Sequence, residues 1–420
     1  MKYLNFVINR SFFYFKIYFF LILLFILLCV RLVFYNKTPD TLKNFSAKVL
    51  VTNPSYIDDG VIVINSTPYV VRTRQLGDYK MGYLYNIVGD KYYNTIYAKK
   101  ITIAEKSYLE PLFYLKNILV TSISSVLLEP FASLILGMLY GVPPNYGELQ
   151  KNTLIKAGVI HVIVVSGYNI SILFSFVSSI FSLVSIKKRM LIASLISVTF
   201  AIFTGFESPI LRALVFGLII AFAKATGNKA SIFYVLLTTG ILIGILSPRI
   251  LFSVSFQLSF MACVGLVLLS GDFNFLLNKV YIFNILPKEL KESFVSSFCA
   301  QLMVFPILLY YFNDFSLISL VTNVLVLWLV PTIMLLGIFL SILSLFGLLY
   351  FTKIFLIVVY PPLIFFVDVV ELMSNIPFTL NVKLSTYTVV FIYFCLFLLI
   401  FLYTKVIKNR LILYNDKEVT

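Results

Sequence analysis

The stretch that decides the fold runs from Gly141 to Leu173 and reads GVPPNYGELQKNTLIKAGVIHVIVVSGYNISIL. It is apolar enough to enter a membrane, but its centre holds a cation, the chain's one histidine, and a small-residue break followed by an amide: Lys156, His161, Ser166, Gly167 and Asn169. Polar groups at bilayer depth are costly and normally face a protein interior or a water-filled path. Because lipid offers no hydrogen bonds to a free backbone group, the Ser-Gly break predicts two half-helices in place of one.

These polar residues also have an ordinary structural interpretation. His161 would then be a hydrogen-bonded histidine of the protein interior, and Ser166-Gly167 would let a neighbouring helix approach closely. Spacing alone does not separate this interpretation from a functional one, so both stay open at this point.

Composition places the chain among polytopic membrane proteins. Of its 420 residues, 60% are hydrophobic and 12% charged, and the mean hydropathy is +0.99, which excludes a soluble globular domain of this length. The formal charge of +15 first indicates basic cytoplasmic loops and only secondarily a polyanionic substrate. The cysteines have no paired spacing, so we expect no disulfide framework, no metal centre and no cofactor.

The first 35 residues predict an N-terminal transmembrane span. Basic residues precede an unbroken apolar run over 17–30, and no small-residue cleavage site follows it. An uncleaved span with a cytoplasmic N-terminus is therefore preferred over a signal peptide.

Residues 36–106 predict a small extracytoplasmic β-barrel of the OB type. Five alternating stretches are separated by turn residues, Gly89-Asp90-Lys91 among them, and lie at 47–51, 60–64, 69–74, 80–89 and 96–103. This segment has ten basic residues, six acidic residues and eight tyrosines, which would suit a nucleic-acid strand stacked on aromatic rings. The simpler alternative is a barrel whose tyrosines only fill its core and rim.

The remaining chain predicts an α-helical membrane protein with broken or re-entrant helices. Residues 107–141 contain an interfacial amphipathic helix over 110–128 and a short helix over 128–141, and residues 142–410 form the polytopic domain, followed by a cytoplasmic tail at 411–420. Candidate spans are 190–205, 209–224, 230–246, 251–269, 294–312, 317–330, 332–350, 354–373 and 386–403. A cytoplasmic position of the basic tail requires one crossing fewer. Either 317–330 is re-entrant and ends at Pro331, or one of the final segments lies in the interface. The first is preferred because Asn323 and Pro331 interrupt this segment.

Further polar residues lie within these candidate spans. Glu207 and Arg212 flank a Ser-Pro helix start, and a buried arginine there needs a partner, which would be Glu207 or a phosphate. The others are hydroxyl and amide residues, namely Ser255, Gln257, Ser259, Gln301 and Asn323. Interhelical hydrogen bonding is the common explanation for each residue alone. Together they outline a polar seam.

Five motifs in order resemble those of the ComEC competence family. HVIVVSGYNISIL, beginning at His161, resembles its His-(apolar)-Ser-Gly signature, and TGFESPILRALVF, beginning at Thr204, resembles its Thr-Gly-Phe-x-x-Ser-x-x-Arg-Ala segment. LSPRILFSVSFQLSF is similar to the Phe-Gln-Leu-Ser-Phe segment, and FPILLYYFNDFSLISLVTNVLVLWLVP to the downstream Asn-(apolar)-Pro region. LLEPFASLILGMLYG also resembles a family segment, although Glu129 precedes Pro130 here. The resemblance extends from the first span to about Gly337.

The resemblance implies an inner-membrane channel for single-stranded transforming DNA during natural competence, and not an enzyme. Many members continue into a histidine-rich nuclease domain, whereas this sequence has one histidine, so strand degradation would fall to a possible separate nuclease. No Gly-x-x-x-x-Gly-Lys-Ser/Thr loop occurs, so a cytoplasmic ATP-driven DNA motor is an expected partner. A cell-surface DNA receptor, membrane lipids and a possible homodimer are the other expected partners. The channel-lining residues would be Lys156, His161, Ser166, Gly167, Asn169, Glu207, Arg212, Ser255, Gln257, Ser259, Gln301 and Asn323.

Two other classes of function stay open. A secondary transporter or small-solute permease also uses broken helices with polar centres, and a membrane scaffold would use the polar seam only to join its helices. The soluble insert after the first span is atypical of transporters and favours the channel.

Overall fold

The computed structural model describes residues 24–32, 41–58, 61–67, 69–77, 79–93, 95–142, 148–163, 166–205, 208–228, 230–280, 283, 287–376 and 379–415. The chain divides into two compact units. The first comprises Met1–Thr153, Ile160–Ser253 and Leu329–Asp368, and the second comprises Leu154–Val159, Val254–Trp328 and Val369–Thr420.

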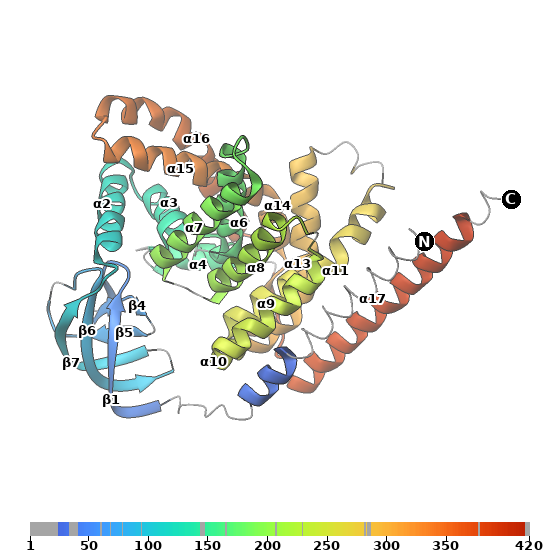
Figure 1. The fold of residues 1–420 in the computed structure, drawn as a ribbon, viewed down its shortest axis with the longest axis horizontal. Coiled ribbons are helices and arrows are strands. Elements are labelled where there is room, and N and C mark those ends of the chain that lie inside the picture. The colour runs from blue at the N-terminus through green and yellow to red at the C-terminus, as the bar shows by residue number, and fades with distance from the viewer. Residues whose placement is uncertain are drawn as a thin grey trace. The chain divides into compact units, whose positions relative to one another are not determined.

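A nearly closed β-barrel follows the first described helical residues, 24–32 (Figure 1). Its strands are β1 (Thr41–Val51), β2 (Tyr56–Asp58), β3 (Val61–Ile64), β4 (Ser66–Thr67), β5 (Val70–Thr73), β6 (Tyr83–Tyr92) and β7 (Thr95–Lys106). They are ordered β2-β3-β5-β7-β6-β1-β4, with β5 and β7 parallel and the other pairs antiparallel. Alternate residues such as Val49, Val71 and Ile87 fill one core, which explains the alternating pattern in the sequence. The OB-like barrel is therefore confirmed.

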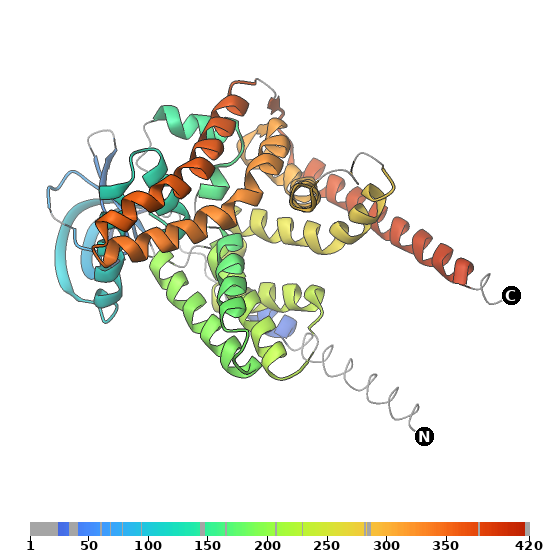
Figure 2. The ribbon, with the colours of Figure 1, turned by 90° about the horizontal axis from the view of Figure 1, so that it is seen from above.

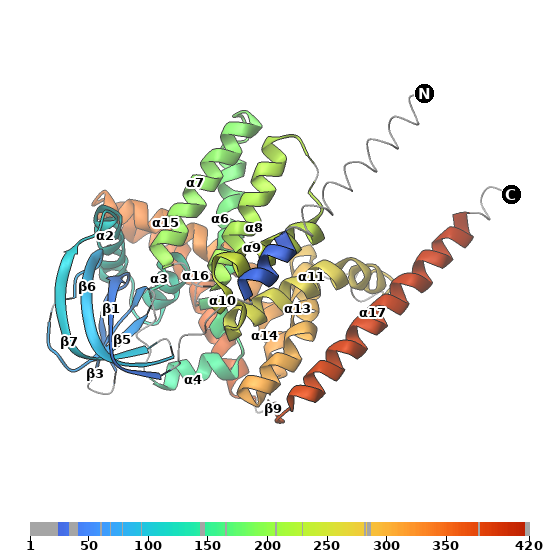
Figure 3. The same cartoon turned by 60° about the horizontal axis from the view of Figure 1, so that its bottom comes forward.

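One predicted turn of the barrel is wrong. The sequence places a turn at Gly89-Asp90-Lys91, but β6 runs through these residues to Tyr92, beside β1 and β7 (Figure 3). A Cβ atom on Gly89 would lie 2.1 Å from the carbonyl oxygen of Tyr97, where the register of β6 and β7 shifts. This glycine therefore marks a bulge where two strands approach closely, and not a chain reversal.

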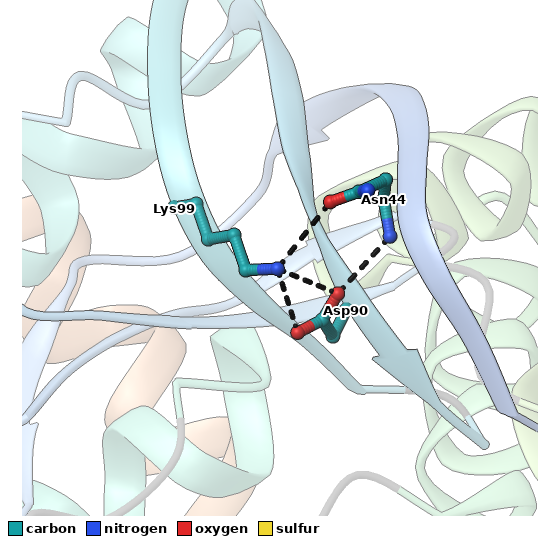
Figure 4. Close-up of polar contacts among 3 residues, drawn as sticks. All are labelled: Asn44, Asp90 and Lys99. Carbon is teal, nitrogen blue, oxygen red and sulfur yellow. Dashed lines mark hydrogen bonds and ion pairs between the residues drawn. The ribbon is translucent and has the colours of Figure 1, made fainter.

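Asp90 on β6 links the two strands beside it, β1 and β7 (Figure 4). Its carboxylate accepts the backbone N–H of Asn44 at 3.0 Å and the ammonium of Lys99 at 2.9 Å. The hydrogen bond from Asn44, followed by the one from Lys99, lowers the pKa of Asp90 below its usual value. Asn44 has a φ of 52° and lies where the register of β1 shifts, so the carboxylate holds an irregular part of β1 onto β6.

The tyrosines of the barrel differ in exposure, with a buried group, an exposed group and three half-buried residues. Tyr79 and Tyr85 are buried, and burial, with a smaller contribution from Tyr85, raises the pKa of Tyr79. Tyr92, Tyr93 and Tyr97 are exposed, and the rings of Tyr92 and Tyr97 meet edge to face at 5.6 Å between centroids. The core and rim interpretation therefore accounts for the first group, while the second leaves aromatic surface open to solvent.

The helices of the first unit begin directly after the barrel. α2 (Glu110–Val126) buries one face and packs on α15 (Val330–Leu345), while α3 (Phe131–Tyr140) is buried along nearly its whole length (Figure 1). Both helices were predicted, including the shortness of α3. The chain continues through α4 (Glu148–Lys156), α5 (Ile160–Ile163) and α6 (Gly167–Ile180), so the predicted interruption of the Gly141–Leu173 stretch is confirmed.

Three neighbouring helices form the core beside this interruption (Figure 2, green). α6 packs against α7 (Ile186–Thr204) and α8 (Ser208–Ala225), and Ile170, Ala201 and Ala213 are among the buried residues where they meet. α9 (Ile232–Leu246), α10 (Pro248–Leu251) and α16 (Leu349–Ser374) follow, the last ending beyond the first unit.

The second unit is built on two long helices. α11 (Val254–Leu277) packs along α13 (Lys288–Phe312), where the rings of Phe273 and Phe298 stack with centroids 4.5 Å apart. α14 (Ile318–Val326) and α17 (Thr386–Asn415) also contact α13 (Figure 3). A short ribbon pairs β8 (Asp314–Ser316) with β9 (Thr379–Asn381).

The segment predicted to end at Pro331 does not end there. α14, the 3-10 turn η1 (Leu327–Leu329) and α15 form one helical run of 28 residues, Ile318–Leu345. Pro331 lies in the first turn of α15, directly after the 3-10 turn, and the first turn of an α-helix tolerates proline. The two candidate spans are therefore joined in one helical run.

Four helices of the described chain are long and apolar enough to cross a membrane: Val254–Leu277, Lys288–Phe312, Ile318–Leu345 and Tyr350–Ser374. Phe131–Tyr140, Gly167–Ile180, Ile232–Leu246 and Thr386–Ile400 are shorter apolar helices. Length and composition thus agree with a multi-pass membrane protein containing broken helices.

Candidate functional site

Asn169 ties the start of α6 to α3. Only 1% of the residue is exposed, and its Nδ2 donates to the carbonyl oxygen of Met138 at 3.0 Å. Its Oδ1 accepts the hydroxyl of Ser166 at 3.1 Å, and Ser166 is the extended N-cap residue of α6. Both ends of the amide are used inside the protein, so Asn169 fixes where the interrupted helix resumes.

Arg212 lies directly against this helix start. A Cβ atom on Gly167 would lie 2.9 Å from an Nη2 atom of Arg212, 3.0 Å from the Cβ of Ala213 and 3.2 Å from the carbonyl oxygen of Pro209. A larger residue at position 167 would therefore require α8 or the side chain of Arg212 to shift. Arg212 itself is buried, with 8% of its surface exposed. The structure thus brings together Ser166, Gly167, Asn169 and Arg212, from two of the predicted motifs.

The electrostatics of this place are unusual for two packed helices. The N-terminus of a helix carries partial positive charge on its free N–H groups, and the guanidinium adds a full positive charge beside it. Both attract anions, and a guanidinium in a place shielded from water binds carboxylate or phosphate oxygens strongly. We call Ser166, Gly167, Asn169 and Arg212 the α6 start site.

His161 and Lys156 are placed differently from these residues. His161 is exposed on the short helix α5, within the first unit, so it is not a histidine of the interior. Lys156 is exposed in the second unit, where its carbonyl oxygen accepts the hydroxyl of Ser316 at 2.6 Å. Glu207 lies outside the described residues.

The polar residues of α11 make local contacts. Gln257 is half-buried, and its Oε1 accepts the hydroxyl of Tyr311 on α13 at 3.2 Å. Ser259 donates within its own helix, to the carbonyl oxygen of Phe256 at 3.1 Å, and Ser255 is exposed. The side chain of Gln257 thus links α11 to α13.

α13 and α14 share a second polar contact. Nε2 of Gln301 donates to the hydroxyl of Ser319 at 3.2 Å. One turn further along α14, Asn323 is 4% exposed, and its Oδ1 finds no donor among the described residues. A buried carbonyl without a donor is costly, and such groups in native proteins call for an explanation.

Sequence reasoning missed two polar contributors. Ser319 accepts from Gln301, and Lys116 on α2 is fully buried. A signal for Lys116 was available, because Phe113, Lys116, Val120 and Ile123 recur at helical spacing on the buried face of α2. A lysine on the apolar face of an amphipathic helix indicates a buried ammonium with specific acceptors.

No cluster of three or more His, Cys, Asp or Glu residues able to hold a metal ion occurs within the described part of the chain. The donors that the site offers are hydroxyl, amide and guanidinium groups. These groups bind anions and polar chains by hydrogen bonds.

Comparison with known proteins identifies the family. Residues 138–406, well over half of the chain, match the family described as Competence protein. Over 173 residues the chain is 31% identical to ComE operon protein 3 of Bacillus subtilis (strain 168); this stretch is 40% of the chain but only 21% of that relative. No solved structure matches this one. The resemblance found in the motifs is thereby confirmed, and the chain belongs to the Competence protein family.

Proposed function

We propose that this chain is a membrane channel through which single-stranded DNA enters the cytoplasm during natural competence. Family membership supports a role in competence, and the long apolar helices fit a protein embedded in the membrane. In this role the chain would let the strand cross the membrane and would not hydrolyse it. Its substrate would be a flexible polyanion that has to slide without being held.

One observation carries the proposal: the buried guanidinium of Arg212 beside the start of α6. A guanidinium has five N–H donors in a planar fork whose geometry matches the oxygens of a phosphate. A phosphate group fits both the guanidinium and the free N–H groups of a helix start. Neither group reads a base edge, so contacts of this kind would bind each passing phosphate without regard to sequence.

The barrel supports the same substrate in a different way. Tyr92, Tyr93 and Tyr97 expose aromatic surface at one end of β6 and β7, and stacking on such rings binds single strands with little sequence preference. Several barrel lysines form ion pairs, since Lys48, Lys99 and Lys106 each lie near a carboxylate. We therefore expect stacking to contribute more than charge to any binding by the barrel.

The proposed channel requires partners. A cell-surface receptor would deliver the strand, a cytoplasmic ATP-driven motor would pull it, and a separate nuclease would remove the complementary strand. Surrounding lipids would seal the channel, and a second copy of the chain could complete its wall. His161, which is exposed in the first unit, is proposed to face the path, as is Lys156 in the second unit.

The test uses a naturally transformable host whose own Competence family gene is deleted and replaced by this one. Fluorescent double-stranded DNA is supplied, and surface-bound and cytoplasmic label are counted separately. We expect cytoplasmic label only when the gene is present, with surface binding equal in both strains. Equal cytoplasmic label without the gene contradicts the proposal.

A second measurement separates a channel from a small-solute permease. Proteoliposomes containing the purified chain are loaded with a labelled single-stranded oligonucleotide and then exposed to an external nuclease. A channel makes the label vulnerable, and duplex DNA of the same length stays protected. A permease leaves both substrates protected, and that result would favour the transporter class.

A further inference from the structure

Lys116 is a buried cation with acceptors from two parts of the first unit. The residue is 0% exposed, and its Nζ donates to the carbonyl oxygen of Thr52 at 2.9 Å. The same Nζ donates to Oδ1 of Asn53 and to the carbonyl oxygen of Phe203. Thr52 and Asn53 follow β1 of the barrel, whereas Phe203 lies in the last turn of α7.

The chemistry of this contact is well matched. An ammonium has three N–H donors, and here it meets three oxygen acceptors. The carbonyl of Phe203 is among the last four of α7, which have no partner within the helix and form its negative end. A lysine at that position is therefore stabilised both by hydrogen bonds and by the helix dipole.

A second contact joins the same two parts. Gly205, the left-handed residue that ends α7 with a φ of 86°, lies beside the barrel. The hydroxyl of Thr67 on β4 donates to the carbonyl oxygen of Gly205 at 3.5 Å, and Oγ1 of Thr52 lies 3.6 Å from the position that a Cβ on this glycine would occupy. The end of α7 thus rests on the barrel at two places.

The segment held in this way leads directly to the α6 start site. α8 begins at Ser208, three residues after Gly205, and its first turns supply the carbonyl of Pro209 and the guanidinium of Arg212 that lie against Gly167. The position of α8 therefore depends on where α7 ends. Where α7 ends depends in turn on its contact with the barrel through Lys116.

We infer that Lys116 is a positioning residue: it fixes the barrel to the end of α7 and so sets the place of Arg212 against α6. The importance of this geometry for uptake rests on the proposed function, but the coupling itself does not. A displacement of the barrel would then change the position of Arg212 at the α6 start site. The sequence assigns the barrel and the site to separate predicted domains, and the ammonium joins them.

The experiment measures this coupling without DNA. Spin labels are attached through an unnatural amino acid at positions 100 and 188, exposed lysines on β7 and α7, and the distance between them is measured in nanodiscs. We expect one narrow distance in the unsubstituted chain, a broad distribution in Lys116→Met, and a narrow one restored in Lys116→Arg. An unchanged narrow distance in Lys116→Met overturns the inference.

Two controls make the result specific. Lys91→Met removes another fully buried lysine, whose Nζ lies 5.2 Å and 5.5 Å from the ring centroids of Phe45 and Tyr69 within the barrel, and should leave the distance narrow. Arg212→Ala should also leave the distance narrow. A broad distance in Lys91→Met as well would show that any barrel defect frees the label, and would overturn the assignment to Lys116.

Uptake is scored separately, per inserted molecule. Lys116→Met should lower DNA uptake about tenfold, the effect of leaving buried acceptors without their charged donor, and Lys116→Arg should restore most of it. Normal uptake in Arg212→Ala would contradict the proposed role of the α6 start site, while the label distances would still decide the inference about Lys116. Normal uptake per inserted molecule in Lys116→Met would contradict the importance of this geometry for uptake, while the label distances would still decide whether Lys116 fixes the barrel to α7.

Discussion

The two units differ in how they accommodate polar side chains among apolar helices. At the α6 start site of the first unit, a guanidinium lies beside a helix N-terminus and a closely packed glycine. In the second unit, neutral amides and hydroxyls meet across neighbouring helices, as Gln257 does with Tyr311 and Gln301 with Ser319. Neutral pairs of this kind are the usual way to join membrane helices. The buried charge of Arg212 thus distinguishes the α6 start site from these neutral contacts.

The largest expected effect is on DNA uptake and comes from removing the guanidinium of the α6 start site. Arg212→Ala should lower DNA uptake about 30-fold per inserted molecule, because a charge-assisted hydrogen bond to a buried group is lost. Arg212→Lys should recover part of the activity, since the charge remains but the planar fork does not. Label reaching the cytoplasm is the measurement, and Arg249→Ala serves as the arginine control. Equal loss in both alanine variants would remove the special role of Arg212.

A crowding test comes next. Gly167→Ala should destabilise the protein by about 1–3 kcal/mol and lower uptake, because the new methyl group would overlap the neighbours of α8. The matched control is Gly217→Ala on α8 itself, where an added Cβ would meet no described atom within 4 Å. The melting temperature in detergent and uptake are measured for both variants. A harmless Gly167→Ala would mean that α6 and α8 are not closely packed.

Within the first unit, Asn169 tests whether a residue of the α6 start site serves packing or function. Asn169→Ala removes the hydrogen bonds to Met138 and Ser166 and should cost about 1–3 kcal/mol of stability. We expect uptake to fall only in proportion to the amount of folded protein, since this amide serves the packing of α6 on α3. A variant that is as stable as the parent but inactive would instead move Asn169 to the functional group.

Substitutions of the neutral amides in the second unit should change stability only slightly. Asn323→Leu should keep or raise stability by up to about 1 kcal/mol, because it removes a buried oxygen that has no donor among the described residues. Gln301→Leu should lower stability by about 0.6 kcal/mol through the loss of its bond to Ser319. Normal uptake is expected in both variants. A stable but inactive Asn323→Leu would show that this amide contacts the substrate.

The smallest expected effect concerns pH and the barrel. The pKa of Asp90 is lowered in the folded state, so its contribution is present above the ordinary carboxyl pKa and is lost as pH falls through the lowered value. Hydrogen exchange of β1 and β6 should therefore be slower than in Asp90→Asn near neutral pH, and the difference should vanish in strong acid. Comparing both proteins at each pH cancels the intrinsic pH dependence of exchange. No difference at neutral pH would contradict this role of Asp90.

Much of the fold could be predicted because its patterns are local. Alternation placed the long strands of the barrel, and Ser166-Gly167 located the helix break, since both depend on a few neighbouring residues. Gly89 and Pro331 led to wrong predictions because each residue type occurs in two settings. Glycine is found both at turns and at β-bulges, and proline is found both after a helix end and in the first turn of a helix. Only the partner strand and the continuing helix decide between these uses.

The candidate site was only partly predictable, for a different reason. Arg212 was singled out by its charge in an apolar run, and its neighbour Gly167 by the break, but nothing local states that the two meet across 45 positions of sequence. Lys116 was overlooked although it lies on the buried face of α2. Its acceptors come from two segments far from it in sequence, and no local pattern in the sequence indicates them.

The absence of room at Gly167 has an evolutionary consequence. A methyl group at this position would lie 3.0 Å from the Cβ of Ala213, so the two positions cannot both carry side chains without a shift of the helices. Relatives in which position 167 has gained a methyl group are therefore expected to have lost one at position 213. Paired substitution of this kind would record the contact between α6 and α8 in the history of the family.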